Sequence, residues 1–393
     1  LIFFKNIIKI FIIFIAMSDI GNLSYSQSEP EAKKSTYTEF DSLDFVINVG
    51  EGRALVKNSV KLMGNLRLNS TGTTAATADV ALNHAIGIHA VIDSTQVNFG
   101  DGPKAGNVEN LQNYARLVKM VSAGTQDAND YNNASNLMEL RCASQALAGA
   151  TQIQRSTRVA GGQAAVLTDQ DFACKLHICL NKMDGDNLAY SKTGPIRVSL
   201  NLAKNLAALE GALVGSVANY SLSDVRLAYS AMDEPKGPSQ SVMRTAYSFK
   251  SSVLSTTANI SAVVPAVCDS VTISAQRQDR ESTNVFSNYQ LEEVRNFKSV
   301  QYMFNDNTSK YISYVIESKE EALEKGVESL VASGINGVFS AGKLQRNGNF
   351  MLGLPFNGFI DLSNQRFNLQ LVSDIDSQNP YNLFLYFHSI ISL

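Results

Sequence analysis

The residues best suited to chemistry are grouped in Cys174-x-x-His177-x-Cys179, which brings two thiols and an imidazole close together. Thiolates and imidazoles are the preferred protein ligands of zinc. However, the segment DFACKLHICL alternates in polarity like a β-strand, which would place Cys174 on one face and both His177 and Cys179 on the other. The CxxC ligand pair is absent, and buried free cysteines behave as small hydrophobic side chains. We therefore expect no metal site here.

The other polar residues form no catalytic pattern, and the motifs GxSxG, HExxH, GxxxxGK[ST] and GxGxxG do not occur. His84 and His89 are five residues apart, which does not suit two ligands on one helical face. His388 falls in an apolar terminal segment, where we expect a packed imidazole. We expect two pairs of acidic residues to be solvated: Glu292 with Glu293, and Glu320 with Glu321. We expect Asp361 to cap a turn. The sequence thus predicts a protein that is not an enzyme, with no catalytic, cofactor-binding or metal-binding residues and no cofactor.

Composition bounds the class of protein. The chain has 393 residues, of which 45% are hydrophobic and 18% charged, so it can bury two domain cores. A formal net charge of −3 and the lack of a basic arm argue against direct, sequence-specific binding of nucleic acid. The four cysteines do not form a disulfide framework in a chain of this length, and such scattered thiols favour a reducing compartment: Cys142, Cys174, Cys179 and Cys268.

A short passage occurs twice, which predicts an internal duplication. Ala90-Val91-x-Asp93-Ser94 and Ala266-Val267-x-Asp269-Ser270 are separated by 266 − 90 = 176 residues. Arg116 and Arg295, which follow the two copies, are separated by 295 − 116 = 179 residues. A repeat of this length corresponds to a whole domain rather than to a unit of a solenoid.

The pattern along the chain gives the predicted boundaries. Residues 1–16 (LIFFKNIIKIFIIFIA) precede Met17 and are interpreted as an upstream translation artefact, with a signal-like segment as the alternative. Residues 17–43 are polar and predict a flexible N-terminal arm. Residues 233–241 contain two prolines and a glycine and predict a linker between domains at 44–232 and 242–393.

Most of the remaining chain predicts β-strands. Alternating segments at 45–49, 59–68, 194–202 and 220–233 are typical of half-buried strands, with a bulge or bend at Gly64. Residues 87–100 also predict a strand, and the spacing of apolar residues predicts a helix over 108–124.

The second half carries the clearest signals. A helix is predicted over 318–334, with Ser318 and Glu321 as a capping box, Gly334 after its end, and an apolar face of Leu323, Val327, Leu330 and Val331. Phe367, Leu369 and Leu371 should share the inner face of a strand, and the apolar segment 381–393 should lie in the middle of a sheet. Short strands at this spacing, with few helices in the connections, indicate a mainly β protein built of sandwiches.

The order of these segments resembles the double jelly-roll major capsid proteins of icosahedral DNA viruses and tailless phages. The segments that carry the resemblance are SVKLMGNLRL, GIHAVIDSTQVNFG with VENLQNYARLVKM, GPIRVSLNL with YSLSDVRLAYSAMD, and GFIDLSNQRFNLQL with YNLFLYFHSIISL, over the chain from about residue 44. The resemblance implies two consecutive jelly-roll β-sandwiches and a homotrimeric, pseudo-hexagonal capsomer in a virion. It further implies contacts with neighbouring capsomers, with penton and minor capsid proteins, and between the N-terminal arm and an internal membrane.

Two alternatives remain at this point. A penton or minor capsid protein would contain one jelly roll. The number of sandwiches in the structure therefore tests this alternative. A secreted carbohydrate-binding β-sandwich protein would need residues 1–16 to be a signal. Its sugar platform would be drawn from the aromatic residues of the last segment: Tyr381, Phe384, Tyr386 and Phe387.

Overall fold

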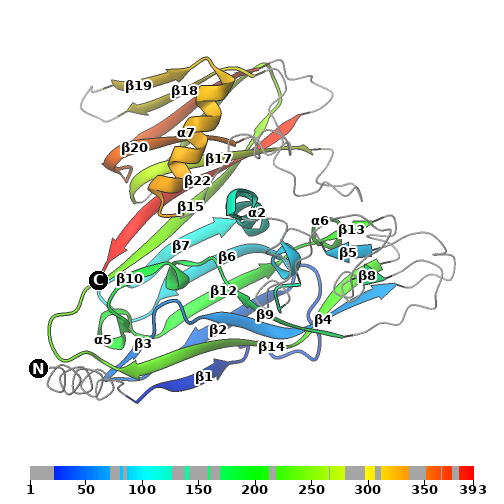
Figure 1. The fold of residues 1–393 in the computed structure, drawn as a ribbon, viewed down its shortest axis with the longest axis vertical. Helices are drawn as coiled ribbons and strands as arrows, with labels where there is room; N and C mark the ends of the chain where they lie inside the picture. Colours follow the sequence, from blue (N-terminus) through cyan, green and yellow to red (C-terminus); the bar gives the residue numbers. More distant parts are fainter. Residues whose placement is uncertain are drawn as a thin grey trace, which may run out of the picture.

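The computed structural model describes residues 22–70, 80–82, 86–125, 138–140, 158–159, 169–211, 218–264, 266–278, 297–305, 311–335, 351–363, 365–373 and 380–393. Figure 1 shows two layered β bodies that follow one another along the long axis of the molecule. Residues 1–16, for which the sequence predicts an artefact or a signal, lie outside the described residues. No helix in the described part of the chain is both long and apolar enough to span a membrane.

The first half contributes eight main strands and one helix. In chain order these are β1 (Ser24–Ser28), β2 (Ser42–Ile47), β4 (Lys61–Ser70), β6 (Ile92–Phe99), β7 (Gly106–Gln112), α2 (Tyr114–Thr125), β9 (Gln170–Lys175), β12 (Ile196–Leu202) and β14 (Ala218–Asp233). One sheet has the order β1-β14-β4-β9 and the other has the order β2-β12-β6-β7. All of these neighbours are antiparallel.

Shorter elements complete the first half. They are β3 (Arg53–Leu55), β5 (Val80–Leu82), η1 (Gly87–Val91), β8 (Arg158–Val159), η3 (Cys179–Asn181), β10 (Met183–Gly185), β11 (Leu188–Ala189), α5 (Tyr190–Thr193), α6 (Asn205–Ala208) and β13 (Leu209–Gly211). Strands β3 and β11 extend the sheet of β14, while β13, β5 and β8 form a small separate sheet.

The second half repeats the plan. Its elements are β15 (Ser241–Val253), β16 (Thr257–Ala262), β17 (Val267–Arg277), β18 (Phe297–Asn305), β19 (Tyr311–Ile316), α7 (Lys319–Ala332), β20 (Met351–Asp361), β21 (Arg366–Ser373) and β22 (Tyr381–Ser392). The sheet orders are β15-β22-β17-β20 and β16-β21-β18-β19. In both halves the main strands therefore pair as first-eighth-third-sixth and second-seventh-fourth-fifth, with the helix between the fifth and sixth strands.

The repeated topology confirms a duplicated architecture but corrects the sequence alignment behind that prediction. Ala90–Ser94 spans the end of η1 and the start of β6, the fourth main strand of its half. Ala266–Ser270 leads into β17, the third main strand of its half. The two passages are not equivalent in the fold, and Arg295 lies outside the described residues. The similarity of the short passages reflects two strand beginnings of like composition.

The last strand behaves as predicted. Strand β22 lies between β15 and β17 and is buried along most of its length. Tyr381, Phe384, Tyr386 and Phe387 are at most 5% exposed. Because sugar-binding platforms need an exposed aromatic face, these side chains cannot serve as one. Phe367, Leu369 and Leu371 of β21 are also buried, as the alternation predicts.

Helix α7 begins and ends where the sequence indicates. The Ser318 side chain accepts a hydrogen bond from Glu321 N at 3.3 Å, and Gly334 has a φ of +75° just beyond the helix. The predicted apolar face is wrong at Val331, which is 54% exposed. The helix instead buries small residues, including Gly326, because it lies close against β20 and β17.

Two predictions in the first half need correction. The helix predicted over 108–124 begins only at Tyr114, because Asn113 has a φ of +55° and the residues before it form β7. The strand predicted over 87–100 begins at Ile92, after the 3₁₀ turn η1. Both errors come from apolar spacing that continues across a change of backbone conformation.

The flexible arm predicted for residues 17–43 is not what the structure describes from residue 22 onward. Strand β1 pairs with β14 between Ser24↔Ala231 and Ser28↔Leu227. Tyr37 is 3% exposed, and its backbone bonds reciprocally with that of Leu222. The polar composition of this segment gives no strand signal, because β1 is stabilised by its backbone pairing with β14 rather than by burial of its own side chains.

Gly64 marks an irregularity, as predicted, but the extra residues are on the neighbouring strand. The register of β14 against β4 shifts between Ser223 and Arg226, opposite Gly64. A Cβ on Gly64 would lie 3.0 Å from Ser223 O and 3.1 Å from the Phe172 ring. A side chain here would therefore press against the bulge and the packed ring, one of which would have to shift slightly.

Candidate functional site

The two halves meet where the fifth strand of the first half lies beside the first strand of the second. Strand β7 pairs with β15 in parallel at a single register position, Tyr247↔Asn110, and this joins the sheets of both halves into one nine-stranded sheet. Two hydroxyls of β15 extend the contact: Thr245 Oγ1 donates to Val108 O at 2.8 Å, and Ser248 Oγ to Asn110 O at 3.3 Å. We call this contact between β7 and β15 the seam.

Helix α2 fixes the seam through Arg116, which is only 7% exposed. Its guanidinium donates to Asn113 Oδ1 at 2.7 Å and to Gln276 Oε1 of β17. The guanidinium carbon lies 4.1 Å from the centre of the Phe384 ring on β22. Tyr386 Oη also donates to Asn113 O at 3.1 Å. A cation buried over an aromatic face is favourable, so α2 binds the first half to the second.

Strand β7 also contributes a buried carboxyl, that of Glu109, which contacts η3. Glu109 is fully buried, and its Oε2 accepts a hydrogen bond from Cys179 N at 2.9 Å. Loss of hydration raises the pKa of Glu109 to about 7, although the hydrogen bond from Cys179 and the charge of Lys182 act in the opposite direction. The same burial holds the pKa of the Cys179 thiol well above its usual value, so this thiol is a poor nucleophile and a poor metal ligand.

The structure separates the Cys174, His177 and Cys179 cluster into three structural roles. Cys174 is buried in β9, and Cys179 begins η3. The backbone N–H of His177 donates to the Tyr114 hydroxyl, and its ring lies 5.5 Å from that of His89. Over the described ranges, no group of three or more His, Cys, Asp or Glu side chains is placed to hold a metal ion.

Most other residues singled out from the sequence are also placed. Asp361 Oδ1 accepts a hydrogen bond from Ser363 N at 2.9 Å, as expected for a carboxylate that caps a turn. His388 is 4% exposed within β22. Glu320 and Glu321 lie in the first turn of α7, where negative charge favours the helix. His84, Cys142, Glu292 and Glu293 lie outside the described residues.

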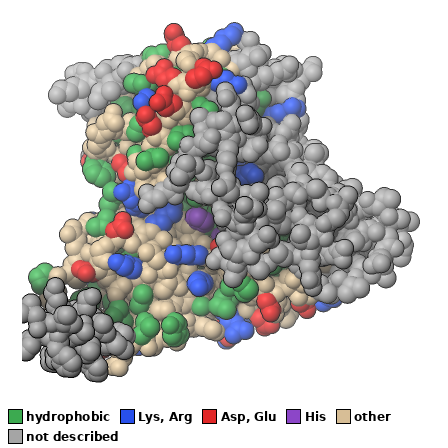
Figure 2. Space-filling model, in the orientation of Figure 1, with side chains coloured by type: hydrophobic (Ala, Val, Ile, Leu, Met, Phe, Trp, Pro, Cys, Tyr) green, Lys and Arg blue, Asp and Glu red, His purple; other side chains and the backbone are tan. Residues whose placement is uncertain are grey.

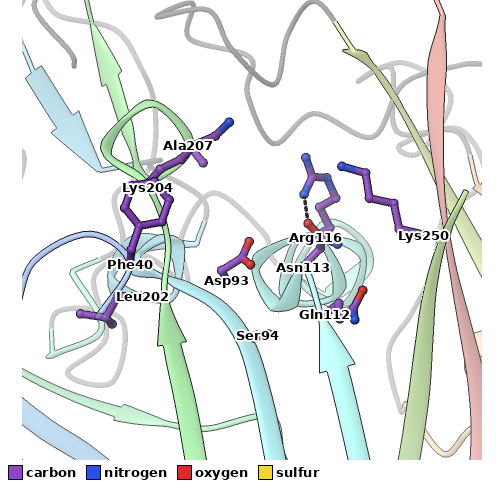
Figure 3. Close-up of a pocket in the computed structure, with 10 residues that line it drawn as sticks. All are labelled: Phe40, Asp93, Ser94, Gln112, Asn113, Arg116, Leu202, Lys204, Ala207 and Lys250. Atoms are coloured by element: carbon purple, nitrogen blue, oxygen red, sulfur yellow. Dashed lines mark hydrogen bonds between the residues drawn. The ribbon is translucent and has the colours of Figure 1, made fainter. Parts of the chain in front are cut away.

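A cavity of about 390 Å³ opens beside the seam. Figure 3 shows Arg116 and Lys250 near each other on one side, Asp93 between them and the opposite wall, and Phe40 with Lys204 on that wall. The described lining contains three cationic side chains, one carboxylate, and no His or Cys. Sequence reasoning missed the cavity because it is formed by segments from both halves.

Comparison with known proteins supports the topology. No protein-family model matches the sequence, and no curated protein matches it. Among solved structures, the Faustovirus major capsid protein is similar with a TM-score of 0.59 at 10% identity, over 95% of this chain and 90% of that chain. PBCV-1 VP54, as fitted into a reconstruction of the virophage Sputnik, gives 0.53 at 10% identity over 95% of both chains. A chain of the Sputnik virophage structure gives 0.53 at 10% identity, over 95% of this chain and 86% of that chain.

The fold is a double jelly roll. The repeated strand order and the similarity along almost the whole chain agree on this point, as the sequence predicts. The double jelly roll places two equivalent sandwiches side by side with the seam between them.

Proposed function

We propose that this chain is a major capsid protein that forms trimeric, pseudo-hexagonal capsomers in the shell of an icosahedral DNA virus. The observation that carries the proposal is the seam, which fixes two jelly rolls of the same topology side by side. One chain then supplies two of six similar positions around an axis. Three chains complete the ring through heterologous contacts that close by symmetry.

Other features support a structural role. The first jelly roll would comprise residues 24–233 and the second residues 241–393, with residues 234–240 as their connection. A penton or minor capsid protein with one jelly roll does not fit two complete sandwiches. The weak net charge of −3 suits protein–protein contacts better than contacts with the genome. Within the virion, the partners would be neighbouring capsomers, penton and minor capsid proteins, and an internal membrane.

The proposal is tested by the mass and shape of the purified full-length chain. Light scattering should give three times the chain mass of 42.7 kDa, and negative-stain images should show hexagonal particles. Circular dichroism of the same sample establishes that the chain is folded. A folded chain that stays monomeric at micromolar concentration, or that forms oligomers without a hexagonal outline, would overturn the proposal.

A further inference from the structure

The seam uses one edge of each jelly roll, and the equivalent edges have no strand partner in the described part of the chain. Strand β7 is the fifth main strand of the first half, and β19 is the fifth of the second. Likewise, β15 is the first main strand of the second half, and β1 is the first of the first half. Among the described residues, β19 pairs only with β18, and β1 pairs only with β14. Within the residues that the structure describes, each chain thus carries one unused edge of each kind.

We propose that β19 of one subunit pairs in parallel with β1 of the next subunit, so that the seam within the chain is repeated between chains. The inference rests on the proposed capsomer and names the surfaces that build it. Figure 1 shows β19 and β1 near opposite ends of the long axis. That placement suits a head-to-tail contact in which every subunit gives one edge and receives the other.

Exposed apolar side chains on β1 and β19 support the proposed pairing of these two edges. Tyr25 of β1 is 81% exposed, and Leu23 just before it is 46% exposed. On β19, Tyr314 is 36% and Val315 is 50% exposed. Natural sheets usually protect free edges with charges or covering segments. Apolar side chains on two open edges are better explained by a surface that becomes covered.

Charge around the edges is complementary. Figure 2 shows acidic side chains gathered at the end of the molecule where α7 lies, and Glu317 and Glu320 are exposed there beside β19. Just after β1, Glu29 is paired with Lys33, and Glu31 is paired with Arg197 at 2.8 Å. Arg53 donates to Asn22 O at 2.9 Å, and Arg226 donates to Gln27 Oε1 at 3.2 Å, so cationic groups flank this strand. Opposite charge at the rims would favour the correct pairing and weaken it at high salt.

The internal seam also predicts the register between subunits. Asn110 is two residues before Gln112, the end of β7, and Tyr314 is two residues before Ile316, the end of β19. On the other strand, Tyr247 faces Phe387, which is 392 − 387 = 5 residues before the end of β22.

In the first half, the residue five before the end of β14 is 233 − 5 = 228, and Ala228 faces Gln27. Since Asn110 pairs with Tyr247 within the chain, Tyr314 should lie opposite Gln27 of the next subunit.

A cysteine pair tests the register directly. In the full-length chain, Tyr314→Cys combined with Gln27→Cys should form disulfides between subunits under mild oxidation, because facing positions on paired strands meet the Cα separation that a disulfide needs. Non-reducing gels should then show covalent dimers and trimers that disappear on reduction. The controls are each single variant, the parent chain with its native cysteines, and the pair Gln27→Cys with Phe359→Cys, since Phe359 is exposed on β20, which belongs to a different sheet from β19 and from β1.

A variant that introduces a charge tests the same edge without a crosslinking reaction. Tyr25→Asp should raise the concentration at which half of the trimers dissociate by at least about tenfold, which corresponds to 1.4 kcal/mol. Phe359→Asp, a matched exposed aromatic position, should leave that concentration unchanged. Because Tyr25 is mostly exposed, the variant monomer should stay folded by circular dichroism.

The outcomes separate the two proposals. A folded parent chain that remains monomeric overturns the capsomer itself. A hexagonal parent trimer that neither crosslinks through the designed pair nor weakens with Tyr25→Asp overturns the edge pairing and leaves the capsomer standing. Specific crosslinks within open filaments would support the edge pairing and contradict the closed ring.

Discussion

The Oγ1 atom of Thr272 lies 3.0 Å from Nε2 of His388, in the buried sheet of the second jelly roll. The Thr272 hydroxyl also lies 2.7 Å from the Ser329 hydroxyl on α7, so an uncharged imidazole is linked to the helix through two hydroxyls. Desolvation is the main cause that lowers the pKa of His388 to about 3, and the charges of Lys182 and Arg244 act in the same direction.

This histidine should make the protein less stable as the pH falls from its ordinary pKa of 6.5 toward 3. In that window the unfolded chain binds a proton that the folded chain excludes, so unfolding becomes more favourable. The contribution at about pH 5 is roughly 2 kcal/mol. His388→Gln, which keeps a polar group near Thr272, should lack this loss when urea unfolding is compared at about pH 7 and pH 5. An unchanged pH dependence in the variant would show that His388 is charged when folded.

Glu109 should act in the opposite direction. Its folded pKa of about 7 exceeds the ordinary 4.5, so the folded chain keeps a proton that the unfolded chain loses as pH rises. Stability from this group is present below pH 4.5 and lost as pH rises to 7. Glu109→Gln should therefore stabilise the protein by on the order of 3 kcal/mol at about pH 8 and by little at about pH 4.

Urea unfolding at a fixed protein concentration measures this effect, because association also shifts apparent stability. Glu51→Gln is the matched control, since Glu51 is an exposed residue of a turn. An equal gain for Glu109→Gln at both pH values would contradict titration of the carboxyl and point to better packing instead.

The sequence predicted the elements whose side chains alternate between a core and solvent. Strands β12, β21 and β22 follow from their own apolar patterns, and α7 follows from the cap at Ser318. The prediction failed where the structure of a segment depends on a neighbouring strand or on a local change of backbone conformation. Strand β1 contains three serines and is held by β14, and the helix predicted over 108–124 continued apolar spacing across Asn113.

The seam could not be predicted for a related reason. Asn110 and Tyr247 are 247 − 110 = 137 residues apart, and their contact is parallel and limited to one pair, so neither residue carries a local signal. Arg116 was noted in the sequence only as part of a repeat. Its role depends on Gln276 and Phe384, which come from the other half of the chain. The alternation of apolar residues along a strand predicts which face is buried. It does not predict which strand edges lie next to each other in the fold.

Gly326 should be essential to the seating of α7. A Cβ at this position would lie 2.7 Å from Met351 O and 2.8 Å from Met351 Cγ. Gly326→Ala should thus lower the free energy of unfolding by about 1–3 kcal/mol, despite the better helix propensity of alanine, because the helix must move away from β20. Val331→Ala on the exposed side of the same helix should change stability by less than about 0.5 kcal/mol. Chemical denaturation of both variants measures the difference, and a stabilised Gly326→Ala would show that α7 does not lie so close to β20.

Replacement of Leu369 by Asp should unfold the second jelly roll. Leu369 is fully buried in β21, opposite Ile260 of β16 and Tyr302 of β18. An unpaired carboxylate at this position loses its hydration with no partner, and the site also loses an apolar side chain, which together should cost more than about 4 kcal/mol.

Gln370→Glu, on the other face of the same strand, is the control and should remain folded, because Gln370 faces outward beside Asn259. Hydrogen exchange distinguishes the two halves of the molecule. In Leu369→Asp, protection should be lost throughout the second jelly roll. The loss should include β19, because β16 and β18 hydrogen-bond to β21, and β19 is held only through β18 among the described strands. Loss of β19 removes one of the two edges proposed to join subunits, so this variant should also fail to form trimers. A trimeric Leu369→Asp would mean that the second sheet of this jelly roll is not needed for the contact, and would redirect attention to the sheet that contains the seam.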